Sequence, residues 1–300
     1  MLQSAIGWGF WLGYSPVLLI GKGGLWRPSC CEMFSGSSFD YLSIFIVFCR
    51  MAQEGSEILF AGSFGKLHGY YYDVPGAKSV ALVLPPHPKH GGTMRNKVVK
   101  TIYSCFTKRG LATLRMNYRG VGYSSGQVSV RDEDLIKDAN AAIEWLQSCY
   151  PLVSSFWVAG FSYGAWLSLN LVMRRPEISG FVAVASPLKI HDFSFLSPCT
   201  VSGLMIQGDQ DQLCDIPELL RLTSPISQRL GKFRVEFIEN ADFRMSGESN
   251  LRLLEQKIDD YLAFASTPPS RVYDFSDEVD ETQVHSDVYA EEQLLVDEQI

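Results

Sequence analysis

Residues 156–167 read Phe-Trp-Val-Ala-Gly-Phe-Ser-Tyr-Gly-Ala-Trp-Leu. An apolar run ends in the pattern Gly-x-Ser-x-Gly, and a second apolar run follows at once. This order predicts a strand, a sharp turn and a helix, the arrangement called a nucleophile elbow. Gly160 and Gly164 are needed because a side chain at either position would collide with the neighbouring strand or helix. We therefore expect Ser162 at the top of a sheet, in a strained backbone conformation, beside helix N-terminal amides that stabilise negative charge.

Strand and helix patterns alternate along the chain around this motif. Residues 57–61 and 66–74 predict a hairpin that turns at 62–65, and residues 80–84 form a continuous apolar run, typical of a strand buried on both faces. Further patterns predict strands over 111–116, 156–159, 181–185, 204–207 and 233–238, and helices near 99–106, 129–150 and 251–262. The alternation predicts an α/β fold, with a mostly parallel sheet covered by helices on both faces. Functional residues are then expected at the carboxyl ends of the strands.

A nucleophilic serine needs a base, and in an elbow of this kind the chain order is serine, then an acid, then histidine. The acid is easy to place, because Asp209 and Asp211 follow the strand predicted at 204–207. The histidine is expected after the strand at 233–238, but the residues there read Glu-Asn-Ala-Asp-Phe-Arg over positions 239–244. The five histidines of the chain are at positions 68, 87, 90, 191 and 285. None of them lies in the expected place.

Together these motifs resemble those of the α/β-hydrolases, in particular small enzymes similar to dienelactone hydrolase and serine aminopeptidase. The resemblance covers about residues 57–264 and rests on four segments: 85–94, 117–124, 160–164 and 208–211. It implies the α/β-hydrolase fold, with Ser162 as nucleophile and Asp211 as acid, while Asp209 shapes the turn. The family's closing motif is Gly-Ala-Asp-His, and this chain has Asn-Ala-Asp-Phe over 240–243, so that Phe243 stands where the general base belongs.

Residues 87–92 follow a strand and open toward a helix. In this fold such a loop supplies the first oxyanion donor as a backbone N–H, here expected from His87 or Lys89, and Tyr163 supplies the second. The alternative is a plain flexible turn. His87 and His90 are three residues apart, but no third ligand is suitably spaced and Pro88 breaks any helix that would align them. We therefore expect no metal and no cofactor.

Phe243 raises the question of turnover, because an aromatic ring fills the volume of an imidazole but accepts no proton. Loss of one triad member leaves a rate of roughly 10³ to 10⁴ over water. His191, which follows the strand ending near Ala185, is the candidate substitute base; His87 is another, and either must come within about 3 Å of the Ser162 hydroxyl. Two functions remain open: a serine hydrolase for an ester, thioester or small amide, and an inactive relative that binds a small acyl compound or a protein partner.

Three further features have a plain structural interpretation beside a functional one. Asp211 could instead cap the helix expected near Ile216. The glycines at 120, 122 and 126 have the spacing G-x-G-x-x-x-G, which does not fit a dinucleotide-binding loop and favours a turn. Arg119 could contact an anionic substrate or form a salt bridge that holds this loop.

Charge and cysteine content indicate the class of protein. The net charge is −7, but residues 266–300 contain ten acidic side chains and one arginine, so the acidity belongs to the tail, and residues 265–300 are expected to be disordered. The rest of the chain has no basic excess typical of nucleic-acid binding. The seven scattered cysteines, with no C-x-x-C pair, indicate reduced thiols in a cytoplasmic protein. The expected partner is a small-molecule substrate, and the oligomeric state remains open.

Residues 1–50 differ from the rest in being rich in Trp, Phe, Gly and Ser. Three interpretations remain open: a membrane anchor, an irregular extension, and an over-extended start with Met51 as the true first residue. Residues 41–49 are too short to span a bilayer, and Ser15-Pro16 interrupts the run from 5 to 20. We therefore expect no stable membrane span, and assign the hydrolase-like domain to residues 51–264.

Overall fold

The computed structural model describes residues 55–266. The predictions for residues 1–50 and for the acidic tail beyond position 266 lie outside the described residues. None of the helices within residues 55–266 combines the length and the apolar character needed to cross a lipid bilayer.

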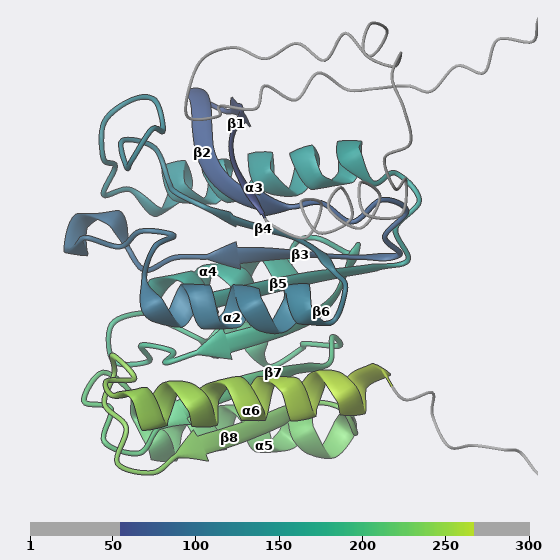
Figure 1. Ribbon diagram of the computed structural model, residues 1–300. Coiled ribbons are helices and arrows are strands. Elements are labelled where there is room, and N and C mark those ends of the chain that lie inside the picture. The colour runs from purple at the N-terminus through teal and green to yellow at the C-terminus, as the bar shows by residue number, and fades with distance from the viewer. Residues whose placement is uncertain (1–54, 267–300) are drawn as a thin grey trace, which may run out of the picture. The chain divides into compact units, whose positions relative to one another are not determined.

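A single sheet runs through the described part of the chain (Figure 1). The order of its strands is β1-β2-β4-β3-β5-β6-β7-β8. β1 and β2 form the expected hairpin, β2 pairs antiparallel with β4, and all the remaining pairs are parallel. The strands are β1 Ser56–Gly62, β2 Gly65–Tyr72, β3 Ser79–Leu84, β4 Ala112–Met116, β5 Ser155–Phe161, β6 Ile178–Val184, β7 Gly203–Gly208 and β8 Arg234–Ile238.

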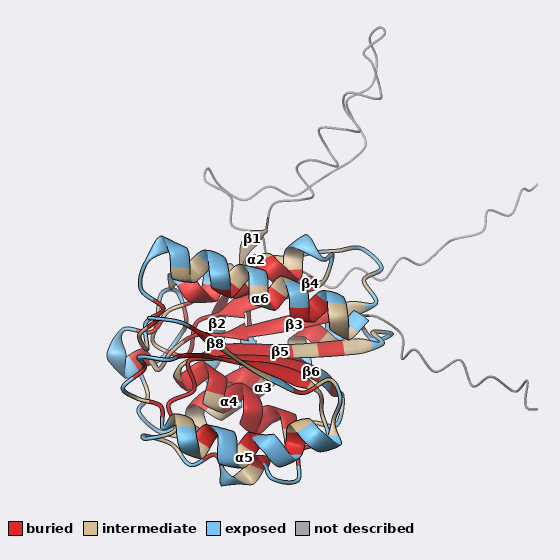
Figure 2. Ribbon diagram, turned by 90° about the horizontal axis from the view of Figure 1, so that it is seen from below, coloured by how far each residue is buried: buried red, intermediate tan, exposed pale blue. Residues whose placement is uncertain are grey.

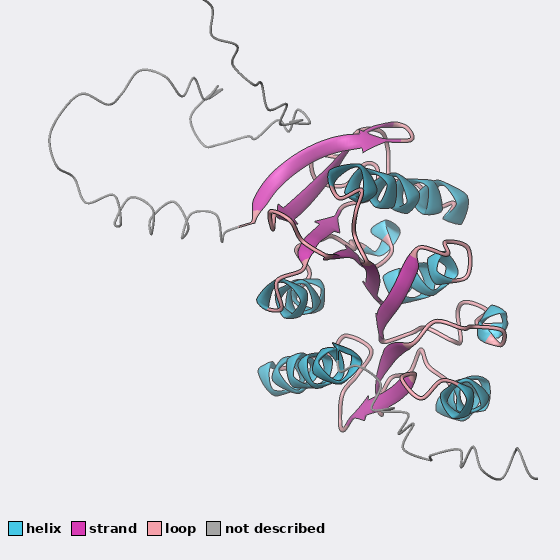
Figure 3. Ribbon diagram, turned by 90° about the vertical axis from the view of Figure 1, so that its right-hand side faces the viewer, coloured by secondary structure: helices cyan, strands magenta, loops and turns pink. Residues whose placement is uncertain are grey.

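Helices cover both faces of this sheet, as the alternating pattern predicts (Figure 3). α2 and α6 lie on one face, and α3, α4 and α5 lie on the other (Figure 2). The helices are α2 Lys97–Lys108, α3 Asp132–Cys149, α4 Tyr163–Val172, α5 Ile216–Arg229 and α6 Glu248–Ser266, with single 3₁₀ turns η1 Pro88–His90 and η2 Ser194–Leu196. The predicted α/β fold is confirmed.

The central strands are buried on both faces because helices pack against each side. Every residue from Val80 to Leu84 in β3 is fully buried, as expected for its continuous apolar run. The edge strand β1 differs, since only Ile58 and Phe60 are buried and their neighbours remain partly accessible. Figure 2 shows the same contrast between the buried strands and the exposed outer faces of the helices.

Two of the alternatives left open by the sequence are decided by side-chain contacts. Asp215, rather than Asp211, caps α5, since its carboxylate accepts a hydrogen bond from the Glu218 N–H at 3.1 Å. The alternative interpretation of Asp211 as the cap of this helix is therefore wrong. Arg119 forms a buried ion pair with Asp138, at 2.7 Å between Nη2 and Oδ1, so it holds its loop against α3.

Candidate active site

The turn between β5 and α4 places Ser162 in a conformation that few residues other than glycine adopt. Its backbone angles are φ 55° and ψ −117°. A Cβ on Gly160 would lie 2.0 Å from the Gly164 carbonyl oxygen, and a Cβ on Gly164 would lie 2.3 Å from the Leu84 carbonyl oxygen. Both glycines are therefore required by close backbone contacts. Such strained residues cost about 1–3 kcal/mol each, and they persist where the surrounding structure holds them.

A cavity of about 590 Å³ opens beside Ser162. This volume is suited to a small molecule. The walls come from the loop after β3, the elbow, the loop after β6, the segment after β7 and the loop after β8. The lining residues are Pro86, His87, His90, Asn96, Phe161, Ser162, Tyr163, Pro187, Ile190, His191, Leu213, Phe243 and Arg244. Segments far apart in the sequence therefore meet around the serine hydroxyl.

Two backbone amides are suited to stabilising an oxyanion in this cavity. Tyr163 is the first residue of α4, so its N–H has no acceptor within the helix. His87 precedes η1, and no hydrogen bond among residues 55–266 engages its backbone N–H. Lys89 does not line the cavity, and its N–H donates to His87 Nδ1 at 3.1 Å. The geometry therefore leaves Tyr163 and His87 as the two candidate donors.

The hydrogen bond from the Lys89 N–H also indicates which nitrogen of the His87 ring carries the proton. Because Nδ1 accepts a hydrogen bond from the Lys89 N–H, a neutral His87 carries its proton on Nε2. Burial lowers the pKa of His87, nearby basic side chains act in the same direction, and the carboxylate of Asp132 opposes them. In this tautomer neither ring nitrogen is free to accept the serine proton, which disfavours His87 as the base.

His191 lines the same cavity and is held by aromatic side chains. Its ring stacks on Trp166, with ring centroids 4.7 Å apart, and meets the edge of Tyr163 at 5.4 Å. Burial lowers the pKa of His191, opposed by the carboxylate of Asp132. A neutral imidazole is the form that accepts a proton. Among the described residues, however, no hydrogen bond joins an imidazole to the Ser162 hydroxyl.

Asp211 lies in the loop after β7 and is buried, whereas its neighbour Asp209 is exposed. The Asp211 carboxylate accepts hydrogen bonds from the Leu213 N–H at 2.7 Å and from the side-chain amide of Gln207. Burial raises the pKa of Asp211, while these donors act in the opposite direction. Gln207 also accepts a hydrogen bond from the Ser186 N–H at 2.9 Å. In this structure the side-chain partner of the Asp211 carboxylate is an amide rather than an imidazole.

Phe243 comes to the cavity from the loop after β8. It is half-buried and lines the cavity together with Ser162. The guanidinium carbon of Arg244 lies 4.9 Å from the centre of the Phe243 ring. This distance is within the range of a cation–π contact. The loop that carries the general base in the resembled family therefore presents an aromatic ring and a cation.

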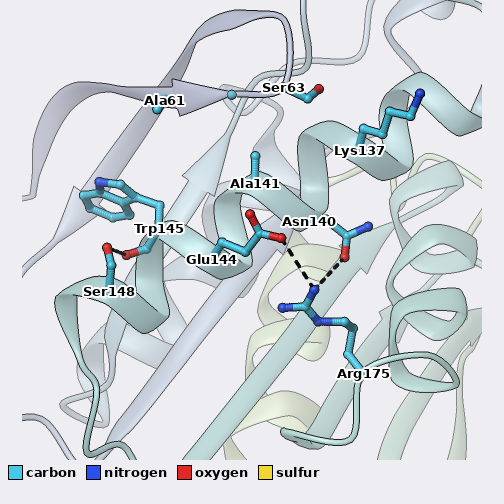
Figure 4. Close-up of a pocket in the computed structure, with 10 residues that line it drawn as sticks. Ala61, Ser63, Lys137, Asn140, Ala141, Glu144, Trp145, Ser148 and Arg175 are labelled. Atoms are coloured by element: carbon cyan, nitrogen blue, oxygen red, sulfur yellow. Dashed lines mark hydrogen bonds and ion pairs between the residues drawn. The ribbon is translucent and has the colours of Figure 1, made fainter.

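A second hollow, of about 680 Å³, lies between the end of β1 and α3 (Figure 4). Arg175 lies at its wall, 3.8 Å from a Glu144 carboxylate oxygen and 3.3 Å from the Asn140 side-chain oxygen. Ser162 is not among the residues that line this second hollow, and the hollow is wide open to solvent. No histidine lies among its lining residues. The reactive groups of the described chain converge on the Ser162 cavity instead.

Sequence reasoning missed several residues that shape this site. Gln207 read only as a strand residue, and nothing in its neighbourhood indicates a partner for Asp211. Asp132 accepts a hydrogen bond from the Tyr163 hydroxyl at 2.8 Å, and Arg244 stacks on Phe243. Each contact joins positions on different loops or helices, or depends on a side-chain rotamer. Within residues 55–266 no group of three potential ligands is arranged to hold a metal.

Comparison with known proteins places the chain among relatives of this fold. The model of the serine aminopeptidase (S33) family matches residues 88–206. An uncharacterised protein of Rickettsia prowazekii is 38% identical over 214 residues, which cover 69% of this chain and 88% of that protein.

Solved structures agree with these sequence matches. An α/β-hydrolase-like protein of unknown function from Agrobacterium tumefaciens is 35% identical, with a TM-score of 0.62, over 70% of this chain and 95% of its own. An α/β serine hydrolase homologue from Coxiella burnetii is 26% identical, also with a TM-score of 0.62, over 70% of this chain and 98% of its own.

Proposed function

This chain belongs to the α/β-hydrolase superfamily, and on that basis we propose that it is a serine hydrolase that acts on an ester, thioester or small amide through Ser162. The observation that carries the proposal is the strained elbow. Ser162 retains φ 55° between two glycines that no larger residue could replace, and it lines a cavity of about 590 Å³. Strained backbone conformations of this kind cost free energy and cluster at active sites, so the conformation of Ser162 favours a catalytic role.

The reaction follows from the groups around the serine. The Ser162 oxygen attacks the carbonyl carbon of the substrate, and its proton passes to a base. The negative charge that develops on the carbonyl oxygen is stabilised by the amides of Tyr163 and His87. The leaving group departs with a proton, and water then hydrolyses the acyl-enzyme. His191 is our candidate for the base, because it lines the cavity and its ring is not engaged as that of His87 is.

Phe243 implies that turnover is slow. Without a histidine between Ser162 and Asp211, the rate should fall toward the roughly 10³ to 10⁴ over water that binding and an oxyanion hole provide. Two observations favour a second function, namely binding of an acyl compound without turnover. The Gln207 amide already satisfies Asp211, and Phe243 faces the same cavity as the nucleophile.

Labelling with a fluorophosphonate serine probe distinguishes these functions. We expect slow labelling of the full-length protein, its loss in Ser162→Ala and its retention in Ser249→Ala, an exposed serine away from the cavity. His191→Gln should lower the labelling rate if His191 is the base, whereas His87→Gln should lower it less. Folded protein that fails to label would refute the hydrolase proposal and leave the binding function.

A further inference from the structure

The lining of the Ser162 cavity carries basic groups without acidic ones. It includes the Arg244 guanidinium and the imidazoles of His87, His90 and His191, and no Asp or Glu lines it within residues 55–266. The remaining lining is apolar or uncharged. A ligand in this cavity therefore meets one permanent positive charge and no negative one.

Arg244 is held at the cavity wall by its neighbour. Its guanidinium carbon is 4.9 Å from the centre of the Phe243 ring, and the residue is exposed enough to reach a ligand. In the described part of the chain, no carboxylate lies within ion-pair distance of this guanidinium. Phe243 thus has a structural role of its own, since its ring packs against the Arg244 guanidinium that lines the cavity.

The carboxylates behind the cavity wall are already engaged elsewhere. Asp242 accepts hydrogen bonds from the backbone N–H of Arg244 at 3.2 Å and from the N–H and hydroxyl of Ser246, both at 2.9 Å. Asp132 accepts the Tyr163 hydroxyl at 2.8 Å. These donors hold both carboxylates. Asp242 also attracts the Arg244 guanidinium electrostatically, but the two groups do not come within ion-pair distance.

We propose that the ligand of this cavity is an acyl compound with a carboxylate at its far end, whose carbonyl lies beside Ser162 and whose carboxylate pairs with Arg244. The inference deepens the proposed function and rests on the same site. Arg presents a planar fork of N–H donors that matches a planar anionic group such as a carboxylate with two parallel hydrogen bonds, which favours such a pairing over a neutral polar group. A monoester or monothioester of a dicarboxylic acid has this chemistry.

The same wall disfavours the substrates that the aminopeptidase family name suggests. An aminopeptidase must bind the α-ammonium group of its substrate, and a buried ammonium group needs an acidic or carbonyl partner. In this cavity the ammonium group would instead lie near Arg244, with no lining carboxylate to oppose the repulsion. We therefore infer selection for anionic acyl compounds and against peptides with a free amino terminus.

Binding to the full-length Ser162→Ala protein tests the proposal without turnover. The probes are three esters of matched length: the monoethyl ester of adipic acid, which is an anion, its neutral diethyl ester, and the cationic ethyl ester of 6-aminohexanoic acid. We expect the anion to bind about tenfold or more tightly than the other two, in ligand-observed NMR titrations. The preference should weaken as salt is raised.

Arg244→Met keeps an apolar stem over Phe243 and removes the charge. It should reduce anion binding to the level of the neutral diester, while Arg252→Met, an exposed arginine on α6 outside the cavity lining, should leave it unchanged. Equal binding of the three probes, no binding of the anion at millimolar concentration, or an unchanged preference in Arg244→Met would each overturn the proposal. Fluorophosphonate labelling tests Ser162 separately, so selective binding without labelling refutes the hydrolase function alone.

Discussion

Replacing Phe243 by histidine should convert this site into a much faster hydrolase. The loop that carries residue 243 is joined to the loop of Asp211, because the Ala241 carbonyl accepts a hydrogen bond from the Gln210 N–H at 3.0 Å. The two loops approach so closely that a Cβ on Gly208 would lie 2.2 Å from the Ala241 carbonyl oxygen. An imidazole at position 243 would therefore start from a loop already held beside the acid, and from a side chain that already lines the serine cavity.

The expected gain follows from what a general base contributes. Proton transfer by a positioned side chain is worth about 10² to 10⁴ in rate. Two features of the site lower this value, since Gln207 already bonds Asp211 and Arg244 would disfavour the protonated imidazole. We therefore expect Phe243→His to raise Ser162-dependent hydrolysis by about 10² to 10³, which corresponds to about 3–4 kcal/mol of the activation barrier.

The assay is hydrolysis of p-nitrophenyl acetate by the wild type, Phe243→His, Phe243→Leu and the double variant Phe243→His with Ser162→Ala. Only Phe243→His should gain activity, and the double variant should lose the gain. Thermal unfolding confirms that each variant is folded. A folded Phe243→His that is no faster than Phe243→Leu would refute the reasoning, because it would show that this loop does not place residue 243 between Ser162 and Asp211.

Three further predictions concern pH and stability. Burial lowers the pKa of His68, His87 and His191, so the unfolded chain binds protons more readily than the folded one. The free energy of unfolding should therefore be highest above about pH 6.5 and fall at lower pH, as denaturant titrations at pH 7.5 and 5.5 would show. Equal stability at the two pH values would contradict this. Gly160→Ala should cost at least about 3 kcal/mol in urea unfolding, because its Cβ would meet the Gly164 carbonyl at 2.0 Å; a tolerated alanine would argue against the elbow geometry. Asp138→Asn should cost about 3 kcal/mol, since it removes the shorter of the two ion pairs of the buried Arg119 guanidinium and leaves only Asp134, at 3.4 Å; the same substitution at exposed Asp209 serves as the control.

Most of the fold could be predicted because its signals are local. The strand, turn and helix around Ser162 follow from twelve consecutive residues. The apolar run in β3 indicated a strand buried on both faces, since a sheet covered by helices leaves no polar side. The departure at Phe243 was also visible, because the closing motif lies in one short segment. For these features, residues near in sequence determine the backbone conformation.

Side-chain contacts could not be predicted in the same way, even between residues close in sequence. Lys89 was expected as an oxyanion donor from its place in the loop, yet the His87 ring engages its N–H. Gln207 became the partner of Asp211, and Arg244 the cation of the cavity, through side-chain positions that no pattern indicates. The chain's local patterns dictate which elements form, since each depends on near neighbours. Which side chains meet at the cavity depends on how five loops pack around one serine, and only the folded protein decides that.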